Sequence, residues 1–272
     1  MDANGILLGA IAGDVIGSYY EHIRTKNYNF KLFRDRSMCT DDTKMTVAVA
    51  DWLLQEDRSS ESLVNLLKNY GRLYPGGYGR EFLNWVLSDN NLPYNSFGNG
   101  SAMRVSPVGW AFDTLEETLE VAKQSAEVTH NHPEGIKGAQ ATAACIFFAR
   151  KGKSKEEIRD YVEHTFGYDL HRTCDEIRPN YQFEISCQKS VPESIIAFLE
   201  SSDYESGIRL AVSMGGDADT MGAITGSIAE AFYGGVPEHI KAEVIKRLPD
   251  EFAQVMTRFY SKFIVWGHIN FY

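Results

Sequence analysis

The 272-residue sequence is short of cysteine and contains no long uncharged apolar run. Its four cysteines lack the C-x-x-C spacing of a zinc or redox site and the density of a small disulfide-bonded secreted domain. We therefore expect reduced thiols and a cytoplasmic protein. The first twenty residues are apolar, but they carry Asp2 and Asp14 and lack the basic start of a signal peptide. No other segment is apolar enough to span a bilayer, so we expect no contact with a membrane.

Positive charge and linker segments are also scarce. A net charge of −10 and a pI of about 5.2 argue against a nucleic-acid groove, because phosphate backbones require a basic surface. No long stretch has the Pro/Ser composition of a linker. The sequence therefore predicts a single domain over residues 1–272, near the upper size limit for one hydrophobic core, and we expect a monomer.

Strand patterns are absent as well. Apolar residues recur at helical spacing along most of the chain, without β-α-β alternation and without a tandem repeat. We predict an all-α fold, a single compact orthogonal helical domain. The expected helices cover residues 6–20, 45–54, 62–73, 82–86, 102–112, 115–128, 134–149, 154–164, 170–178, 192–199, 205–213, 219–233, 237–248 and 251–263. Residues 22–38 and 180–190 are expected to be loops, and 264–272 has no clear pattern.

Glycines are frequent in two of these helices and are spaced about one turn apart. The first helix has Gly5, Gly9, Gly13 and Gly17, and the helix at 219–233 has Gly222 and Gly226. A helix face without side chains lets another helix approach closely, which compensates for the up to about 1 kcal/mol that each interior glycine costs. Either core packing alone or a ligand near the backbone accounts for this spacing.

Two short acidic stretches stand directly ahead of predicted helices. They are Cys39-Thr40-Asp41-Asp42-Thr43 and Gly215-Gly216-Asp217-Ala218-Asp219-Thr220. Each alone is typical of helix capping, since Thr and Asp accept hydrogen bonds from free N–H groups. Together, four carboxylates would repel one another unless cations lay between them, and oxygen ligands select Mg, Mn or Ca. The sequence thus predicts a two-metal site between helix N-termini, provided that the two helix starts meet in space.

Other polar positions suit an anionic ligand. Glu21 stands at a helix C-terminus, where the dipole disfavours a carboxylate, and this hints at a functional role. The glycine-rich loops at 74–80 and 96–101 offer backbone N–H groups to a phosphate, although a flexible turn explains the first loop equally well. Arg104 is expected to bind phosphate or, with slight preference, to pair with a carboxylate.

Five motifs occur in a fixed order along the chain. They are Gly13-Asp14 with Gly17 and Glu21, Thr40-Asp41-Asp42-Thr43, Phe97-Gly98-Asn99-Gly100-Ser101-Ala102-Met103-Arg104, Thr129-His130, and Gly215-Gly216-Asp217-Ala218-Asp219-Thr220. Each is short, but the ordered set is specific. It resembles the ADP-ribosylglycohydrolase family, the group containing the dinitrogenase-reductase-activating glycohydrolase, from about residue 5 to residue 235.

The resemblance implies an all-helical hydrolase that binds two Mg or Mn ions and cleaves the bond between ADP-ribose and an acceptor, at the anomeric carbon of the distal ribose. Its substrate is then an ADP-ribosylated protein or a smaller ADP-ribose conjugate. Implied metal ligands are Thr40, Asp41, Asp42, Asp217, Asp219 and Thr220, with catalytic roles for Glu21 and Asp42. Implied substrate contacts are Gly77, Tyr78 and Gly79 at the diphosphate, Ser96, Phe97, Gly98, Asn99 and Gly100 at the nucleoside, and His130 in the pocket. Phe97 stands where the family stacks an aromatic ring on adenine.

Two other functions remain open. A non-catalytic relative that binds ADP-ribose, or one like the crystallins that share this fold, is opposed by the retained acidic residues. A helical two-metal phosphohydrolase is favoured only if the metals meet phosphate instead of ribose. The acceptor is open too, between arginine and oxygen-linked side chains such as serine. The Phe97–Arg104 loop and the setting of Glu21 resemble the oxygen-linked branch, which implies faster cleavage of serine-linked ADP-ribose.

Overall fold

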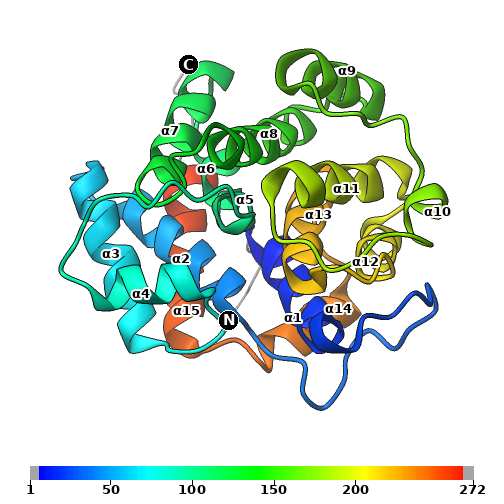
Figure 1. Ribbon diagram of the computed structural model, residues 1–272, viewed down its shortest axis with the longest axis horizontal. Coiled ribbons are helices and arrows are strands. Elements are labelled where there is room, and N and C mark those ends of the chain that lie inside the picture. Colours follow the sequence, from blue (N-terminus) through cyan, green and yellow to red (C-terminus); the bar gives the residue numbers. More distant parts are fainter. Residues whose placement is uncertain (1–5, 266–272) are drawn as a thin grey trace.

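A computed structural model describes residues 6–265 of the chain (Figure 1). This part contains no strand, only an isolated antiparallel bridge between Gly98 and Ser186, so the all-α prediction is confirmed. In chain order the helices are α1 (Leu8–Ile23), α2 (Asp41–Leu54), α3 (Ser60–Leu73), α4 (Arg80–Leu87), α5 (Gly100–Met103), α6 (Ser106–Ala111), α7 (Leu115–Glu127), α8 (Pro133–Arg150), α9 (Lys155–Phe166), α10 (Cys174–Ile177), α11 (Cys187–Glu200), α12 (Tyr204–Val212), α13 (Ala218–Tyr233), α14 (Glu238–Ile245) and α15 (Asp250–Tyr260), followed by the π-helical turn η1 (Ser261–Val265).

Helices α1 and α13 pack against each other along their glycines. A methyl group added to Gly13 would lie 1.9 Å from the carbonyl oxygen of Gly222, and one added to Gly17 would lie 2.2 Å from that of Ala218. Only glycine fits at these two positions of α1, because the two backbones are in contact. The predicted close approach of helices is confirmed, although Gly5 lies outside the described residues.

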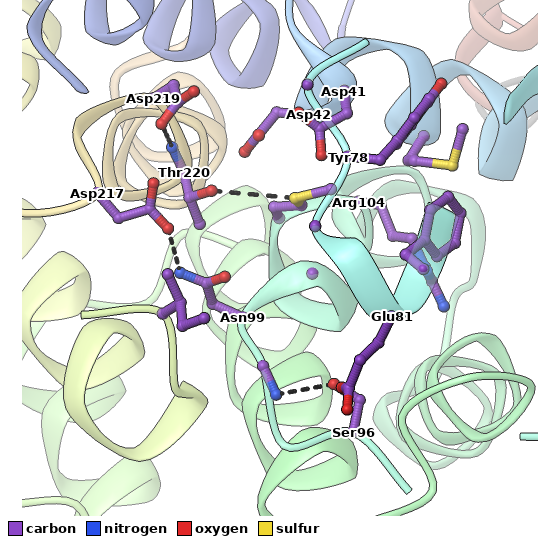
Figure 2. Close-up of a pocket in the computed structure, with 18 of the residues that line it drawn as sticks. Asp41, Asp42, Tyr78, Glu81, Ser96, Asn99, Arg104, Asp217, Asp219 and Thr220 are labelled. Atoms are coloured by element: carbon purple, nitrogen blue, oxygen red, sulfur yellow. Dashed lines mark hydrogen bonds between the residues drawn. The ribbon is translucent and has the colours of Figure 1, made fainter. Parts of the chain in front are cut away.

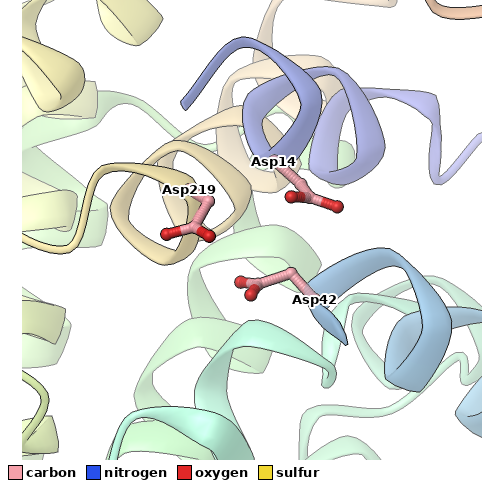
Figure 3. Close-up of side chains that lie close together, drawn as sticks. All are labelled: Asp14, Asp42 and Asp219. Atoms are coloured by element: carbon pink, nitrogen blue, oxygen red, sulfur yellow. The ribbon is translucent and has the colours of Figure 1, made fainter. Parts of the chain in front are cut away.

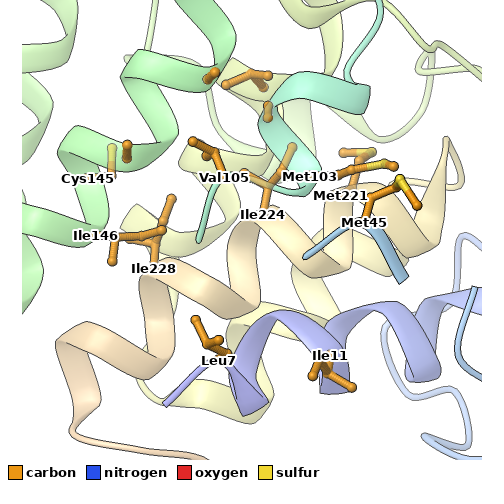
Figure 4. Close-up of a cluster of buried hydrophobic side chains, with 14 of the residues drawn as sticks. Leu7, Ile11, Met45, Met103, Val105, Cys145, Ile146, Met221, Ile224 and Ile228 are labelled. Carbon is orange, nitrogen blue, oxygen red and sulfur yellow. The ribbon is translucent and has the colours of Figure 1, made fainter. Parts of the chain in front are cut away.

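The other helices surround this central pair in two groups. Helices α8, α11 and α12 pack on α13, whereas α2 packs on α3 and α15, and α6 contacts both α2 and α8 (Figure 1). Buried apolar side chains fill the space between the groups, among them Leu7, Ile11, Met45, Ile224 and Ile228 (Figure 4). Full burial of each such side chain contributes about 1.5 to 3 kcal/mol. This core fixes the positions of α1, α2 and α13, whose ends carry the acidic residues.

The helix predicted over residues 102–112 is broken into α5 and α6. Pro107 lies in the first turn of α6, where its missing N–H group costs nothing, whereas a continuous helix would need that N–H group to bond to Met103. The Met103 carbonyl accepts a hydrogen bond from the Thr46 hydroxyl instead (3.2 Å). The break leaves Arg104 between the two short helices.

Two other predicted boundaries were wrong. Helix α11 begins at Cys187, five residues before the predicted start at Pro192, because the Cys187 N–H group is held by the Phe97 carbonyl (2.9 Å). Pro192 therefore lies inside the helix. In the segment predicted as helical over 170–178, only Cys174–Ile177 is helical, and Thr173 caps it.

Within residues 6–265, no helix combines the length and the apolar character that crossing a membrane requires. The pattern-free segment at 264–272 is described only as far as the end of η1, and residues 266–272 lie outside the described part of the chain.

Candidate functional site

A cavity of about 460 Å³ opens beside the N-terminal ends of α2 and α13 (Figure 2). Its volume is in the range of small-molecule sites in proteins. Acidic side chains, glycine-rich loops and aromatic rings line it, and these include Glu21, Asp41, Asp42, Gly77, Tyr78, Gly79, Phe82, Tyr94, Ser96, Gly98, Asn99, Gly100, Arg104, His130, Phe183, Ile185, Asp217, Asp219 and Thr220. The fold thus brings most of the sequence-predicted metal and substrate residues to one cavity.

The two acidic stretches meet here because two helices begin at the cavity. Thr40 caps α2, its hydroxyl accepting from the Asp42 N–H group (3.2 Å), and Asp41 and Asp42 occupy the first turn. Asp217 is the N-cap residue of α13, and Asp219 lies in the first turn of that helix. The first stretch therefore caps its helix as well as facing the cavity, whereas Asp217 makes no capping hydrogen bond with its side chain. At both helix starts the dipole stabilises negative charge at the end that faces the cavity.

Asp14 belongs to the same acidic cluster, although the sequence analysis did not assign it to the site. It is fully buried in α1 and accepts hydrogen bonds from the Thr40 N–H group (2.9 Å), the Thr40 hydroxyl (2.7 Å), the Thr43 N–H group (3.1 Å) and the Thr43 hydroxyl. These bonds fix the start of α2 against α1. The signal in the sequence was a lone carboxylate inside an apolar, glycine-rich helix.

Asp219 is shared by two groups of carboxylates. Oxygen atoms of Asp14, Asp42 and Asp219 lie within 4.8 Å of one another, and the three side chains come from three different helices (Figure 3). Oxygen atoms of Glu21, Asp217 and Asp219 likewise lie within 4.8 Å of one another. Two overlapping groups of three carboxylates fit a pair of cations that share one ligand.

The electrostatics of the cluster also fit cations. Asp42 and Asp219 are almost completely buried, and Oδ1 of Asp42 has no hydrogen-bond partner within residues 6–265. Burial, and next the neighbouring carboxylates, raises the pKa of both groups well above the usual value. Burial likewise raises the pKa of Asp41 to about 7. Oxygen donors that are this unfavourable as bare anions suit hard divalent ions such as Mg²⁺ or Mn²⁺.

Glu21 faces this cluster from the last turn of α1. Its side chain is half-buried and lines the cavity. Burial, followed by the charge of Asp217, raises its pKa, whereas the nearby His22 and Arg24 lower it. A cavity carboxyl with a raised pKa is suited to proton transfer.

The glycine loop that precedes α4 lies directly against the acidic residues. Gly77 has a φ of +93°, and a methyl group there would lie 2.5 Å from Oδ1 of Asp41, so only glycine satisfies both the backbone and the space. The Tyr78 hydroxyl donates to the Tyr74 carbonyl (2.9 Å), and the Lys44 ammonium lies 5.3 Å from the centre of the Tyr78 ring. These contacts hold the loop at the cavity.

The second glycine-rich loop is tied both to the acidic cluster and to the segment before α11. Asn99 donates from Nδ2 to Oδ2 of Asp217 (2.8 Å; Figure 2), and its N–H group donates to the Ile185 carbonyl (2.7 Å). Within the loop, the Ser96 hydroxyl accepts from the Gly98 N–H group (3.1 Å). The Asn99 side chain therefore holds this loop against Asp217.

Two of the sequence-predicted residues are not among those that line the cavity. The Thr40 hydroxyl is bonded to Asp14, and the Phe97 ring is 49% exposed and packs edge-on against the His132 ring, with centroids 5.5 Å apart. Their roles as metal ligand and as adenine-stacking residue stay predictions.

Sequence reasoning also missed the hydrophobic residues of the cavity wall, and two of these are Phe183 and Ile185. They lie in a polar stretch that predicted only a connecting loop, so no periodicity could single them out. The Arg24 guanidinium lies over the Phe183 ring, 4.9 Å from its centre, which places a cation from the 22–38 loop beside this wall.

Arg104 is buried at the cavity wall, and no carboxylate within residues 6–265 pairs with it, so the slight preference for such a pair was wrong. Its Nη2 donates to the Ser125 carbonyl and to the Thr129 hydroxyl, both at 2.8 Å, and its Nε has no hydrogen-bond partner among the described residues. Burial lowers the pKa of Arg104 to about 10, which still leaves the guanidinium charged at neutral pH.

The buried carboxylates predict an unusual stability profile for the metal-free protein. Because burial raises the pKa of Asp41 to about 7, the folded state holds protons that the unfolded chain releases above about pH 4. The free energy of unfolding should therefore fall as pH rises through 7. Saturating Mg²⁺ or Mn²⁺ at pH 8 should raise the melting temperature by about 5 to 10 °C, the effect of a ligand at roughly one hundred times its Kd. Scanning calorimetry with and without chelator checks this; equal melting temperatures would contradict it.

The chain is similar to proteins whose names all refer to the hydrolysis of ADP-ribosyl bonds. The sequence profile of the family ADP-ribosylglycohydrolase matches residues 2–268. ADP-ribosylhydrolase ARH3 of Homo sapiens is 26% identical over 85% of this chain and 85% of its own length. ADP-ribosylarginine hydrolase Tri1 of Pseudomonas putida (strain GB-1) is also 26% identical, over 85% of this chain and 70% of its own. A solved structure, an ADP-ribosylglycohydrolase-related protein complex, aligns with a TM-score of 0.74 and 25% identity, covering 96% of this chain and 97% of that one.

Proposed function

Because the chain belongs to the ADP-ribosylglycohydrolase family, we propose that this hydrolase is metal-dependent and releases ADP-ribose from a modified side chain or small molecule by cleaving the bond at the anomeric carbon of the distal ribose. One observation carries the proposal: two groups of three carboxylates share Asp219, and all of their members except the buried Asp14 line one cavity with two glycine-rich loops. The carboxylates suit cations, and the loops suit the diphosphate of a nucleotide.

The acidic residues hold the cations in this proposal. Asp14, Asp42, Asp217 and Asp219 supply the buried carboxylate oxygens, and Glu21 lies beside Asp217 and Asp219 without being assigned to a cation. Bound Mg²⁺ or Mn²⁺ would polarise substrate oxygens and orient the reacting ribose. The Asn99 bond to Asp217 then couples the substrate-binding loop to the ligand set, so that ribose and nucleoside are positioned together.

Glu21 is assigned the proton transfer. Hydrolysis adds a hydroxyl group from water to the anomeric carbon and a proton to the departing acceptor, so one group of the protein must exchange that proton. Glu21 lines the cavity and is only half-buried, so water and substrate can reach it, and burial raises its pKa, which suits a group that exchanges a proton. The glycine loops next to Asp41 and Asp217 meanwhile keep the rest of the substrate in place.

Incubation of a mono-ADP-ribosylated peptide with the metal-loaded protein tests the proposal. We expect release of ADP-ribose with Mg²⁺ or Mn²⁺, loss of release after chelation, and recovery when the ion is added back. Full turnover after exhaustive chelation would contradict the metal dependence. Binding of ADP-ribose without any release would instead favour the non-catalytic alternative.

We further expect serine-linked ADP-ribose to be released faster than arginine-linked ADP-ribose. The two relatives named above are equally identical to the chain, so the argument rests on the charge of Arg24, whose guanidinium lies over the Phe183 ring at the wall of the cavity that Glu21 also lines. A guanidinium acceptor meets a like charge there, whereas a serine oxygen does not. The rate for the serine-linked peptide should exceed the rate for the arginine-linked peptide about two- to fivefold, the effect of one partly screened repulsion between two guanidinium groups. Side-by-side rates on the two peptides decide, and Arg24→Ala should narrow the ratio; faster release from arginine reverses the assignment.

A further inference from the structure

Three buried side chains, Arg104, Thr129 and His130, form a hydrogen-bonded chain at the cavity wall. Arg104 donates from Nη2 to Oγ1 of Thr129 (2.8 Å), and Oγ1 of Thr129 lies 2.8 Å from Nδ1 of His130. None of the three is more than 5% exposed. Arg104 and His130 line the cavity, while Thr129 is not among the residues that do so. The threonine therefore acts on a ligand only through its neighbours.

The direction of these hydrogen bonds follows from the chemistry of the groups. A guanidinium has donors only, so Oγ1 of Thr129 accepts from Arg104. The hydroxyl hydrogen of Thr129 then needs an acceptor, and Nδ1 of His130 is the remaining partner of Oγ1 among the described residues. Nδ1 consequently carries no hydrogen, and the neutral imidazole is protonated at Nε2. Burial, and next the charge of Arg104, lowers the pKa of His130 well below its usual value and so keeps the ring neutral.

Nε2 of His130 lies against the second glycine-rich loop. A methyl group added to Gly100 would lie 3.0 Å from Nε2, and one added to Gly98 would lie 3.7 Å from it. These two glycines also line the cavity, so the absence of side chains leaves this edge of the imidazole free to meet a ligand. The described residues form no hydrogen bond to Nε2, which keeps its N–H group available.

We propose that Arg104 is a positioning residue, which acts through Thr129 to present the Nε2–H group of His130 as a hydrogen-bond donor to a phosphate oxygen of bound ADP-ribose. The identity of the ligand rests on the proposed function. A phosphate is favoured over a neutral acceptor because Arg104 is a buried cation whose hydrogen bonds within the described chain go to a carbonyl and a hydroxyl, not to a carboxylate. The charge of such a cation, weakly screened in the interior, attracts an anion into the cavity.

The tautomer tests the hydrogen-bond chain directly, without any ligand. Nitrogen-15 spectra of the His130 ring at pH 7, assigned with the His130→Gln variant, should show an unprotonated Nδ1 and a protonated Nε2. In Thr129→Val and in Arg104→Met, we expect a mixture of the two tautomers. Thr129→Ser keeps the hydroxyl and should retain the single tautomer. A ring that is charged or protonated at Nδ1 in the wild type overturns the proposal, as does an unchanged tautomer in both Thr129→Val and Arg104→Met.

Binding measured by calorimetry tests the consequence for the ligand. Thr129→Val and Arg104→Met should bind ADP-ribose and ADP about tenfold more weakly, because a hydrogen bond to a charged acceptor is lost or misdirected. Their affinity for adenosine should stay within about twofold of the wild type. A matched control is Thr142→Val, since Thr142 is buried in α8 and, in the described part of the chain, its hydroxyl bonds only to the Gly138 carbonyl (3.0 Å). An equal loss for adenosine, or no loss for ADP-ribose, contradicts the phosphate assignment.

The two measurements separate this inference from the proposed function. A wild-type protein that holds the Nε2–H tautomer but binds neither ADP-ribose nor ADP refutes the phosphate ligand and the proposed function, and leaves only the hydrogen-bond chain standing. A protein that releases ADP-ribose but carries the Nδ1–H tautomer refutes the hydrogen-bond chain alone. If Thr129→Val does not fold, the tautomers of the wild type, Thr129→Ser and Arg104→Met still decide.

Discussion

Replacing Glu21 by glutamine should lower turnover by about 10²- to 10⁴-fold, the usual contribution of a positioned acid or base. Glutamine keeps the size and most of the hydrogen-bonding capacity of glutamate but exchanges no proton. The affinity for ADP-ribose should stay nearly unchanged, because proton transfer stabilises the transition state and not the bound ligand. Steady-state rates on an ADP-ribosylated peptide, together with calorimetric binding of ADP-ribose, measure the two effects separately.

The matched control for this variant is Glu120→Gln, which changes an exposed glutamate of α7 outside the cavity wall. It removes the same charge without touching the site, so turnover should equal that of the wild type. Unchanged turnover in Glu21→Gln would remove Glu21 from the mechanism. Equal losses in turnover and in binding would make it a substrate contact instead of a proton-transfer group.

Asp219→Asn should abolish measurable release of ADP-ribose, with a loss above about 10³-fold, because it removes the carboxylate that both groups of ligands share. The same change should make the metal-free protein more stable at pH 8. Burial and four neighbouring carboxylates raise the pKa of Asp219 well above its usual value, so its charge opposes folding when no cation is bound. Activity should fall while the stability of the metal-free protein rises, and simple unfolding of the variant cannot produce this combination.

Peptide turnover and calorimetric unfolding with chelator measure the two quantities. Asp113→Asn is the control, since Asp113 has a side chain that is 90% exposed and lies outside the cavity wall. Neither its activity nor its metal-free melting temperature should move noticeably. An Asp219→Asn variant that retains wild-type turnover, or whose melting temperature still rises on adding Mn²⁺ as in the wild type, would contradict the assigned role.

The features that the sequence predicted well are those with a local physical cause. Glycines spaced one turn apart predicted close packing, and α1 and α13 are in backbone contact at Gly13 and Gly222. Acidic residues ahead of apolar periodic segments predicted helix starts, and Asp41 and Asp217 stand at the beginnings of α2 and α13. Capping and helical periodicity act within a few residues, so a single sequence carries both signals.

The features that it missed depend on contacts between distant segments. Asp14 has no local role in α1, and its function appears only when the start of α2 supplies four hydrogen bonds to it. The start of α11 is set by the Phe97 carbonyl, some ninety residues earlier in the chain, and not by Pro192. Phe183 joins the cavity wall because of where its loop runs. None of these positions has a pattern in its own neighbourhood.

The central claim is that the acidic cavity cleaves ADP-ribose from its acceptor, and product identification tests it most directly. Metal-loaded protein is incubated separately with a serine-linked mono-ADP-ribosylated peptide and with free ADP-ribose, and the products are identified by mass. The account predicts the unmodified peptide and intact ADP-ribose from the first substrate, and no reaction with the second. AMP together with phosphoribosylated peptide from the first substrate, or AMP together with ribose 5-phosphate from the second, would contradict it, because the cavity would then cleave the diphosphate and not the bond at the anomeric carbon.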